Sequence, residues 1–223
     1  MWKLIQKLFG SKSSDTGPAP SSPSLPSALE ENSKPEAPKE PKPAPKQKTP
    51  KALDNLAKIA LSQVGVKESG GNNNGVKIRK YQSATNLKPA SWPWCAAFTG
   101  WVIQEWLKDE ENAEWLGLKV MTPDKWRPKT AAAFGYIDWA KGRPATTKVL
   151  SAKAKPQVGD IVIFDFSHIG IITKAGDKSF QAVEGNTNGR GTRDSTSGDG
   201  VWLKTRRSSL VRNYVRINPS TAR

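Results

Sequence analysis

Trp92-Pro93-Trp94-Cys95-Ala96-Ala97-Phe98 is the stretch from which the fold can be predicted, and it holds the only cysteine of the chain. Beyond it, apolar residues recur at steps of three and four as far as Leu107, which predicts a helix that begins near Cys95. Pro93 stands just before that helix, where the missing N–H of a proline costs nothing. In the first turn, free backbone N–H groups and the positive end of the helix dipole favour a thiolate and could bind an oxyanion. A buried structural cysteine is the alternative.

The only histidine of the chain opens a predicted strand. This strand, 168–173, is followed by a second strand at 179–183, which leads into Glu184-Gly185-Asn186. A hairpin of the two strands would bring His168 and Glu184 nearly opposite each other. Glu184 or Asn186 could then accept a hydrogen bond from the imidazole and fix its tautomer. A structural histidine and an ordinary Gly-Asn turn are the alternatives.

The chain as a whole shows helical patterns first and strand patterns later. Helical periodicity occurs at 52–64, 76–83, 95–108 and 129–141. Runs rich in β-branched residues follow at 161–164, 168–173, 179–183, 201–206 and 214–217. Because the connections between these runs are short, we expect an α+β fold, with N-terminal helices packed on a C-terminal antiparallel sheet of about five strands. Residues 113–127 carry no clear pattern.

Composition divides the chain into three segments. Residues 1–10 place apolar side chains on one arc and lysines on the other, as in a cationic amphipathic helix on a membrane surface; a frayed N-terminus is the alternative. Residues 11–50 hold ten of the seventeen prolines and no aromatic residue, which predicts a disordered Pro-rich linker. Residues 51–219 are the predicted folded and catalytic domain, long enough to bury a core.

The chain is strongly basic, with a formal net charge of +15. Residues 52–223 alone carry 26 basic and 15 acidic residues, a net charge of +11. This charge favours a polyanionic partner, such as nucleic acid, an anionic membrane surface or a cell wall that bears acidic polymers. Since no apolar run could span a bilayer and the N-terminus lacks the features of a secretory signal, we expect release or export by another route.

Four blocks of this sequence resemble the CHAP domain, whose name stands for cysteine, histidine-dependent amidohydrolase/peptidase. In the order found in that family they are Trp94-Cys95-Ala96-Ala97-Phe98, Gly159-Asp160-Ile161-Val162-Ile163-Phe164, Ser167-His168-Ile169-Gly170-Ile171-Ile172 and Val183-Glu184-Gly185-Asn186-Thr187. The resemblance covers about residues 51–219. It implies a papain-like fold and a peptidoglycan-cleaving enzyme, as in phage endolysins and bacterial wall hydrolases. It also implies that Cys95 is the nucleophile, His168 the base, and Glu184 and Asn186 the orienting polar residues.

No metal or cofactor is expected. Some CHAP endolysins bind calcium through aspartates just before the cysteine, but the only acid between Asn55 and Glu105 is Glu68. One cysteine and one histidine cannot form an ordinary Cys/His structural zinc site, and no Gly-x-Ser-x-Gly elbow or phosphate-binding loop occurs. Trp92 and Trp94 could line a substrate groove, although aromatic residues beside a helix start also pack into cores.

The resemblance implies a peptidoglycan hydrolase, either a muramoyl-alanine amidase or an endopeptidase, and the Cys-His pair predicts that it uses a thiol mechanism. We expect a monomeric phage lysin that acts in the cell wall or periplasm, with no specific nucleic-acid partner; residues 1–10 could add contact with a membrane surface. One alternative is a non-enzymatic module that binds polyanions through basic side chains, namely Lys204, Arg206, Arg207, Arg212 and Arg216. Another is that residues 1–10 disrupt membranes and are themselves the effector.

Overall fold

The structure is a computed structural model that describes residues 49–118, 122–190 and 198–219. The amphipathic segment predicted at 1–10 and most of the linker predicted at 11–50 lie outside these residues. In the part of the chain that is described, no helix is long and apolar enough to cross a membrane.

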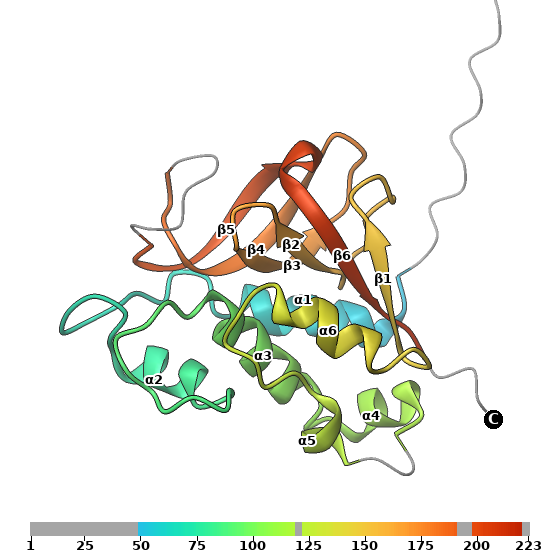
Figure 1. Ribbon diagram of the computed structural model, residues 1–223, viewed down its shortest axis with the longest axis horizontal. Coiled ribbons are helices and arrows are strands. Elements are labelled where there is room, and N and C mark those ends of the chain that lie inside the picture. Colours follow the sequence, from blue (N-terminus) through green and yellow to red (C-terminus); the bar gives the residue numbers. More distant parts are fainter. Residues whose placement is uncertain (1–48, 119–121, 191–197, 220–223) are drawn as a thin grey trace, which may run out of the picture. The chain divides into compact units, whose positions relative to one another are not determined.

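The described chain folds into helices followed by one sheet, as Figure 1 shows. The helices are α1 (Lys51–Leu61), α2 (Val76–Gln82), α3 (Cys95–Trp106), α4 (Glu110–Leu116), α5 (Pro123–Trp126) and α6 (Gly135–Lys141). The strands are β1 (Thr147–Ser151), β2 (Ile161–Phe164), β3 (Ile169–Lys174), β4 (Ser179–Thr187), β5 (Gly200–Arg207) and β6 (Val211–Ile217), with a short 3-10 helix, η1 (Ser208–Leu210), before the last. This arrangement confirms the predicted α+β class.

All neighbouring strands pair antiparallel, in the order β1-β6-β2-β3-β4-β5. The sheet thus has one strand more than the five expected. The additional strand, β1, lies at an edge and pairs with β6. Only its first residue, Thr147, is fully buried, so β1 lacks the apolar run by which a strand is recognised in a sequence.

The helical part also differs in detail from the prediction. Asp109 caps α4 by accepting a hydrogen bond from the N–H of Glu111 at 3.0 Å, so a further helix that the pattern does not predict starts directly after the predicted 95–108 helix. The helix predicted at 129–141 begins only at Gly135, as α6. Before it, the hydroxyl of Thr130 accepts from the N–H of Ala132 at 3.1 Å, a local bond that competes with helix formation.

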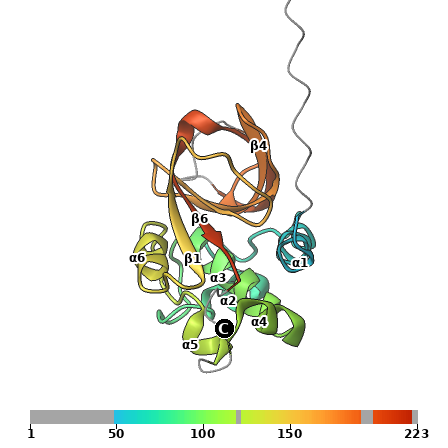
Figure 2. The same cartoon turned by 90° about the vertical axis from the view of Figure 1, so that its right-hand side faces the viewer.

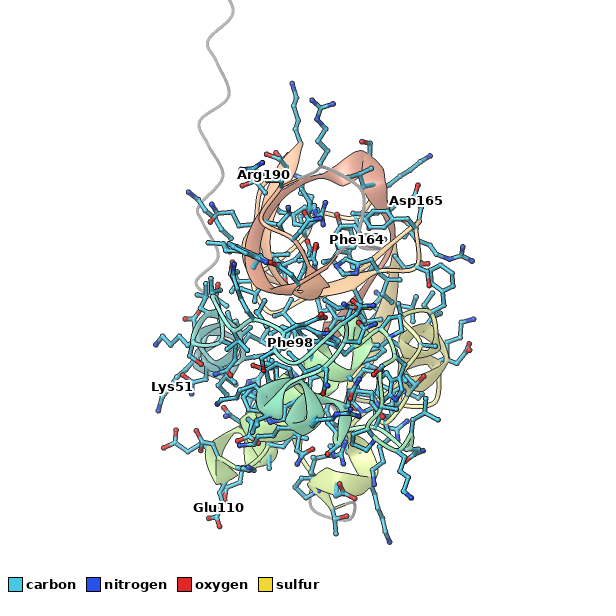
Figure 3. The ribbon with its side chains drawn as sticks, turned by 90° about the vertical axis from the view of Figure 1, so that its left-hand side faces the viewer. Lys51, Phe98, Glu110, Phe164, Asp165 and Arg190 are labelled. Carbon is cyan, nitrogen blue, oxygen red and sulfur yellow. The ribbon has the colours of Figure 1, made fainter. Side chains whose placement is uncertain are left out.

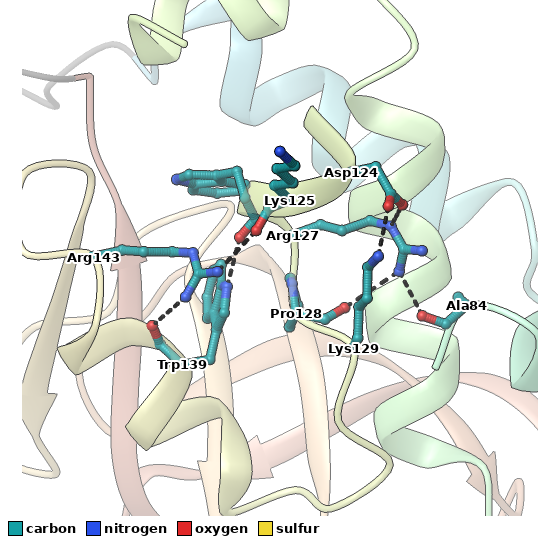
Figure 4. A network of polar contacts seen from close by, with 9 residues as sticks. Ala84, Asp124, Lys125, Arg127, Pro128, Lys129, Trp139 and Arg143 are labelled. Atoms are coloured by element: carbon teal, nitrogen blue, oxygen red, sulfur yellow. Dashed lines mark hydrogen bonds and ion pairs between the residues drawn. The ribbon is translucent and has the colours of Figure 1, made fainter. Parts of the chain in front are cut away.

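Two arginines join α5 to the elements around it, as Figure 4 shows: Arg127 follows α5 and Arg143 follows α6. Arg127 donates to the carboxylate of Asp124 at 2.8 Å and to the backbone carbonyl of Ala84. Arg143 donates to the carbonyls of Trp139 and Lys125, at 3.2 and 3.0 Å. The backbone acceptors of these bonds lie in α5, in α6 and just after α2, so the two arginines tie these helices together.

The helices α1, α3 and α6 pack directly on the sheet, whereas α2 packs on α3 and α4 on α1. The sheet is strongly curved (Figure 2), and apolar side chains fill both of its faces. The larger core lies between sheet and helices, and a smaller one lies in the curl around Phe164, Phe180 and Tyr214. In Figure 3, Phe164 lies within the curve of the sheet, whereas Phe98 of α3 lies where the sheet meets the helices.

Candidate active site

Cys95 is the first residue of α3, as the sequence predicts. The helix begins here because the side chain of Asn186 accepts a hydrogen bond from the backbone N–H of Trp94 at 3.0 Å, immediately before the first turn. The N–H groups that follow have no partner inside the helix. Cys95 is a free, buried cysteine with 8% of the residue's surface exposed.

The hairpin predicted around His168 is confirmed. The strands β3 and β4 pair antiparallel, with Ile171 opposite Val183. His168, one residue before β3, brings its Nε2 to 2.9 Å from Oε2 of Glu184. Both side chains are completely buried. Glu184 is thus the residue that meets the imidazole, and Asn186 is not its hydrogen-bond partner.

Two glycines in these motifs allow close packing around the site. A Cβ on Gly170 would lie 2.7 Å from Cγ of Glu184, and a Cβ on Gly185 would lie 2.6 Å from Cβ of Phe98. Such distances are not tolerated between real carbon atoms. Glycine is therefore required at Gly170 for the Glu184 side chain to pass, and at Gly185 for β4 to pack closely on α3.

The second imidazole nitrogen of His168, Nδ1, is buried without a hydrogen-bond partner among the described residues. It is the ring nitrogen left for the neighbouring thiol of Cys95, because Glu184 occupies Nε2. Burial disfavours the imidazolium ion, but interactions with Cys95 and with Glu184 outweigh this effect and raise the pKa of His168 to about 9. At neutral pH the histidine is therefore held in its charged form, close enough to Cys95 for the two groups to interact.

Glu184 has a second partner that the sequence did not reveal as part of the site. Arg206 of β5 donates from Nε to Oε1 of Glu184 at 2.8 Å and from Nη2 to Oε2 at 2.6 Å. Burial would raise the pKa of Glu184, but the hydrogen bonds from Arg206 and His168 outweigh this and hold it below its usual value. The carboxylate is therefore ionised and acts as the acceptor towards Nε2–H of His168.

Aromatic rings hold His168 and Arg206 in place. The imidazole stacks on Phe164 and on Phe166, with both ring centroids 5.9 Å away. The guanidinium of Arg206 lies over the same two rings, 5.4 Å and 5.8 Å from their centroids. These apolar surfaces restrict rotation of both groups and lower the local dielectric, which strengthens their electrostatic interactions.

Asn186 belongs to a different network, at the start of α3. Its side-chain N–H₂ donates to Oδ1 of Asn73 at 3.0 Å. Glu68, the acid weighed above as a calcium ligand, accepts from Nε1 of Trp94 at 2.8 Å and from the backbone N–H of Asn73 at 2.8 Å. Asn186 and Asn73 both have left-handed backbone angles, with φ of 53° and 54°. The network thus fixes the backbone from which Cys95 projects.

The two tryptophans expected at a groove occupy different environments. The side chain of Trp94 is completely buried and stacks on Tyr81, with ring centroids 5.6 Å apart. Its ring therefore has no surface to offer a substrate, in contrast to the expectation. Trp92 is half-buried and donates from Nε1 to the carbonyl of Lys88 at 2.9 Å.

Gln82 and Tyr136 bind backbone carbonyls on either side of Cys95. The side chain of Gln82 donates to the carbonyls of Ala90 and Trp92, at 2.6 and 3.0 Å, and so fixes the loop that leads to Cys95. The hydroxyl of Tyr136 donates to the carbonyl of Ala96 at 2.7 Å. Burial, together with the nearby Cys95, raises the pKa of Tyr136 well above its ordinary value, so this donor stays protonated.

Three of the five basic residues named above as a polyanion-binding surface have internal partners. Arg206 binds Glu184, and Arg216 of β6 binds Asp160 through two bonds of 2.8 and 2.9 Å. The ammonium of Lys204, a residue only 7% exposed, donates to the carbonyls of Asn188 and Arg190. Since these cations are engaged inside the fold, only Arg207 and Arg212 of the set are exposed.

Comparison with known families gives one match. Residues 87–186 match the family model of the CHAP domain. The matched region starts just before the Cys95 loop and ends at Asn186, so it contains the cysteine, the histidine and the glutamate described above. Comparison with curated proteins gave no match.

Proposed function

This chain carries a domain of the CHAP family, a family of peptidoglycan hydrolases and amidases, and we propose that Cys95 and His168 are its catalytic pair. The single observation that supports the pair best is the geometry of His168. Its Nε2 is fixed on the ionised Glu184, its Nδ1 is buried without a hydrogen-bond partner among the described residues, and its ring interacts with Cys95. An oriented imidazole between a carboxylate and a thiol is the arrangement that thiol hydrolases require.

The proposed reaction proceeds in two halves. The Cys95 thiolate attacks the carbonyl carbon of an amide in the wall peptide, and the oxyanion forms next to the free N–H groups at the start of α3. The imidazolium of His168 then gives its proton to the leaving amine, which leaves a thioester on Cys95. In the second half, His168 takes a proton from water, the hydroxide adds to the thioester, and the carboxylic acid and the Cys95 thiol are released.

The mechanism can be tested at Cys95 itself. We expect Cys95→Ala to abolish the release of soluble fragments from purified peptidoglycan, and Cys95→Ser to lower the rate by at least about a thousandfold, because an alcohol is a far weaker nucleophile. Circular dichroism and thermal unfolding serve as the control that both variants fold. A folded Cys95→Ala protein that still releases fragments at the wild-type rate contradicts the thiol mechanism.

We further propose that the bond cleaved is either the amide between muramic acid and alanine or a peptide bond of the stem or cross-bridge. A thiol nucleophile with a histidine acid can cleave each of these amides. Mass spectrometry of the digested wall distinguishes them, because each bond leaves its own pair of new amine and carboxyl ends. Fragments with new reducing sugar ends and no new amine would contradict the amidohydrolase proposal.

As to its place of action, we propose that the enzyme works in the cell wall or periplasm as a monomeric phage lysin that leaves the cytoplasm during lysis. The basic charge of residues 52–223, +11, supports this proposal because it suits a wall bearing acidic polymers. The role proposed for residues 1–10, contact with a membrane surface, is tested by deleting them. Weaker binding to anionic vesicles with unchanged cleavage of purified wall would support it; unchanged vesicle binding would contradict it.

The alternative proposal, a non-enzymatic polyanion binder, predicts a different response to salt and to alkylation of Cys95 from that of a thiol enzyme. Binding through exposed cations should weaken steeply with salt and should not respond to alkylation of the only cysteine. Wall solubilisation that stops after alkylation with iodoacetamide favours the enzyme. Wall binding that persists after alkylation, with no fragments released before it, favours the binder.

A further inference from the structure

We propose that Arg206 is a positioning residue of this site: it holds the Glu184 carboxylate that orients His168, and it balances the buried charge of the Cys95–His168 pair. The part of this inference that concerns catalysis rests on the proposed function. The part that concerns the charge state of Cys95 rests on the contacts of Glu184 with Arg206 and His168 and on the interaction of His168 with Cys95. Arg206 itself contacts Glu184 and is not proposed to contact substrate.

The contact between Arg206 and Glu184 is bidentate and shares an atom with the histidine contact. Oε2 of Glu184 accepts from Nη2 of Arg206 at 2.6 Å and from Nε2 of His168 at 2.9 Å. Oε1 accepts from Nε of Arg206 at 2.8 Å. With both oxygens bound by one planar guanidinium, the carboxylate cannot rotate away from the imidazole.

The register between β4 and β5 explains how Arg206, near the end of β5, reaches the carboxylate of Glu184. In the pairing of β4 with β5, Glu184 lies opposite Trp202, and Arg206 lies opposite Phe180. Residues at steps of two share a strand face, so Glu184 and Arg206 lie on the same face of the sheet, four residues apart along the strand direction. An arginine is long enough to extend along that face, and Arg206 is 1% exposed.

The charges of the four side chains alternate. With the pair ionised, Arg206 and His168 are positive and Glu184 and Cys95 are negative, so the cluster has no net charge. Lys204 also interacts with Glu184, but its ammonium is bound by two backbone carbonyls and does not contact the carboxylate through a hydrogen bond in the described residues. Without Arg206, Glu184 would therefore lose the guanidinium that it binds directly, and the ionised pair would lie in a buried site with less positive charge to offset the carboxylate, which is unfavourable. The cluster would then avoid this imbalance by keeping the proton on the Cys95 sulfur. Arg206 thus favours the thiolate although it does not touch the sulfur.

Arg206 also fixes where the proton resides between His168 and Glu184. A carboxylate bound by a guanidinium is a weak base, so it accepts a hydrogen bond from Nε2 and does not take the proton. The imidazole therefore keeps its Nε2–H when Nδ1 loses its proton to the leaving amine. Without Arg206, the proton could pass to Glu184 and leave the imidazole in the wrong tautomer.

The experiment measures the rate at which iodoacetamide alkylates the protein as a function of pH. Cys95 is the only cysteine of the chain, so mass spectrometry reports this one thiol without any need to know the substrate. We expect Arg206→Met to move the midpoint of the profile to higher pH by about one unit or more, a tenfold loss of thiolate on the acid limb. Arg206→Lys keeps the charge and loses the second hydrogen bond, so its alkylation midpoint should lie between those of the wild type and Arg206→Met.

A matched control exists in the same sheet. Arg216 makes the same type of two-bonded contact with a buried carboxylate, that of Asp160, but this pair does not touch His168. Arg216→Met should lower thermal stability and leave the alkylation midpoint unchanged. If Arg206→Met is folded and its midpoint equals that of the wild type, or if Arg216→Met shifts the midpoint equally, the inference is overturned.

Removing one partner of a buried ion pair is strongly destabilising, so a second comparison is needed for the case in which Arg206→Met does not fold. This second comparison is between Glu184→Gln and the double variant Glu184→Gln/Arg206→Met. The double variant leaves no unpaired charge, so its unfolding temperature should exceed that of Glu184→Gln. Loss of the cation should again move the alkylation midpoint to higher pH; an unchanged midpoint in this pair also overturns the inference.

Wall hydrolysis is measured on the same variants. We expect kcat to fall at least tenfold in Arg206→Met, with partial recovery in Arg206→Lys and little change in KM, because Arg206 does not meet the substrate. If the wild type releases no fragments but the alkylation profiles shift as described, the proposed function fails and the charge inference stands. If the wild type releases fragments but the alkylation profiles of the variants and the wild type coincide, the charge inference fails and the proposed function stands.

Discussion

At the scale of single residues, the site is a chain of contacts in which each side chain fixes the next. Arg206 holds Glu184, Glu184 holds Nε2 of His168, and Nδ1 is left for Cys95. Asn186 stands apart from this chain and fixes the backbone of the helix start instead. Two kinds of support, one for the imidazole and one for the cysteine backbone, therefore meet at the reacting atoms.

Asn186 can be tested by two substitutions that differ in one respect. Asn186→Ala loses the hydrogen bond to the N–H of Trp94 and keeps a Cβ at φ of 53°, an angle that asparagine adopts more readily than alanine. Asn186→Gly loses the bond but adopts this angle freely. We expect Asn186→Ala to lower the free energy of unfolding by about 2 kcal/mol and Asn186→Gly by about 1 kcal/mol, measured by urea denaturation.

Both Asn186 variants should also lower the rate of Cys95 alkylation, because the start of α3 is less well fixed. Equal losses of stability in the two variants would show that the backbone angle contributes nothing. No loss in either would mean that the network of Glu68 and Asn73 does not depend on Asn186.

At the scale of elements, the site depends on the close approach of β4 to α3. The helix carries Cys95, the strand carries Glu184, and Gly185 lies in direct contact with Phe98 of the helix. The hairpin of β3 and β4 brings in His168 from the next strand. Any change that separates β4 from α3 should therefore separate the cysteine from its base, even where both side chains are intact.

Gly185→Ala tests this dependence. Its Cβ would stand 2.6 Å from Cβ of Phe98, so β4 must move away from α3. We expect the free energy of unfolding to fall by about 2 kcal/mol, and wall hydrolysis to fall more than stability alone explains. The matched control is Gly142→Ala, where the nearest atoms lie at 3.5 Å and φ is −73°, so both properties should stay at wild-type values. An active and stable Gly185→Ala protein would show that the two elements can separate without harm.

At the scale of the whole molecule, buried charges make stability depend on pH. The pKa of His168 is about 9 in the folded protein and 6.5 in its ordinary state. A raised pKa contributes stability that is complete below about 6.5, declines as pH rises, and is lost above about 9. The folded state thus gains from this group at neutral and acidic pH and loses the gain on the alkaline side.

This pH dependence is measured by urea unfolding of the wild type and of His168→Gln between pH 6 and pH 10. We expect the difference in stability between them to shrink by a few kcal/mol as pH rises through the window from 6.5 to 9. Cys95→Ala should show a smaller decline, since the thiol is one of the groups that raise the pKa of His168. A difference that stays constant across the window would contradict a charged His168.

The sequence by itself determined much of the fold and the candidate pair. The helix that starts at Cys95, the hairpin that begins after His168 and the α+β order follow from local periodicity and turn residues, which act over a few positions. The edge strand β1 and the helix α4 were not recognised, because a half-buried strand and a short capped helix leave weak patterns.

Only the tertiary structure decided which polar groups meet. Arg206 looks like a surface cation in the sequence, yet the register of β5 against β4 places it on Glu184. The contact of Asn186 with the start of α3 likewise joins residues 92 positions apart. Such partners are fixed by how strands and helices pack, and a local pattern carries no information about packing between distant segments.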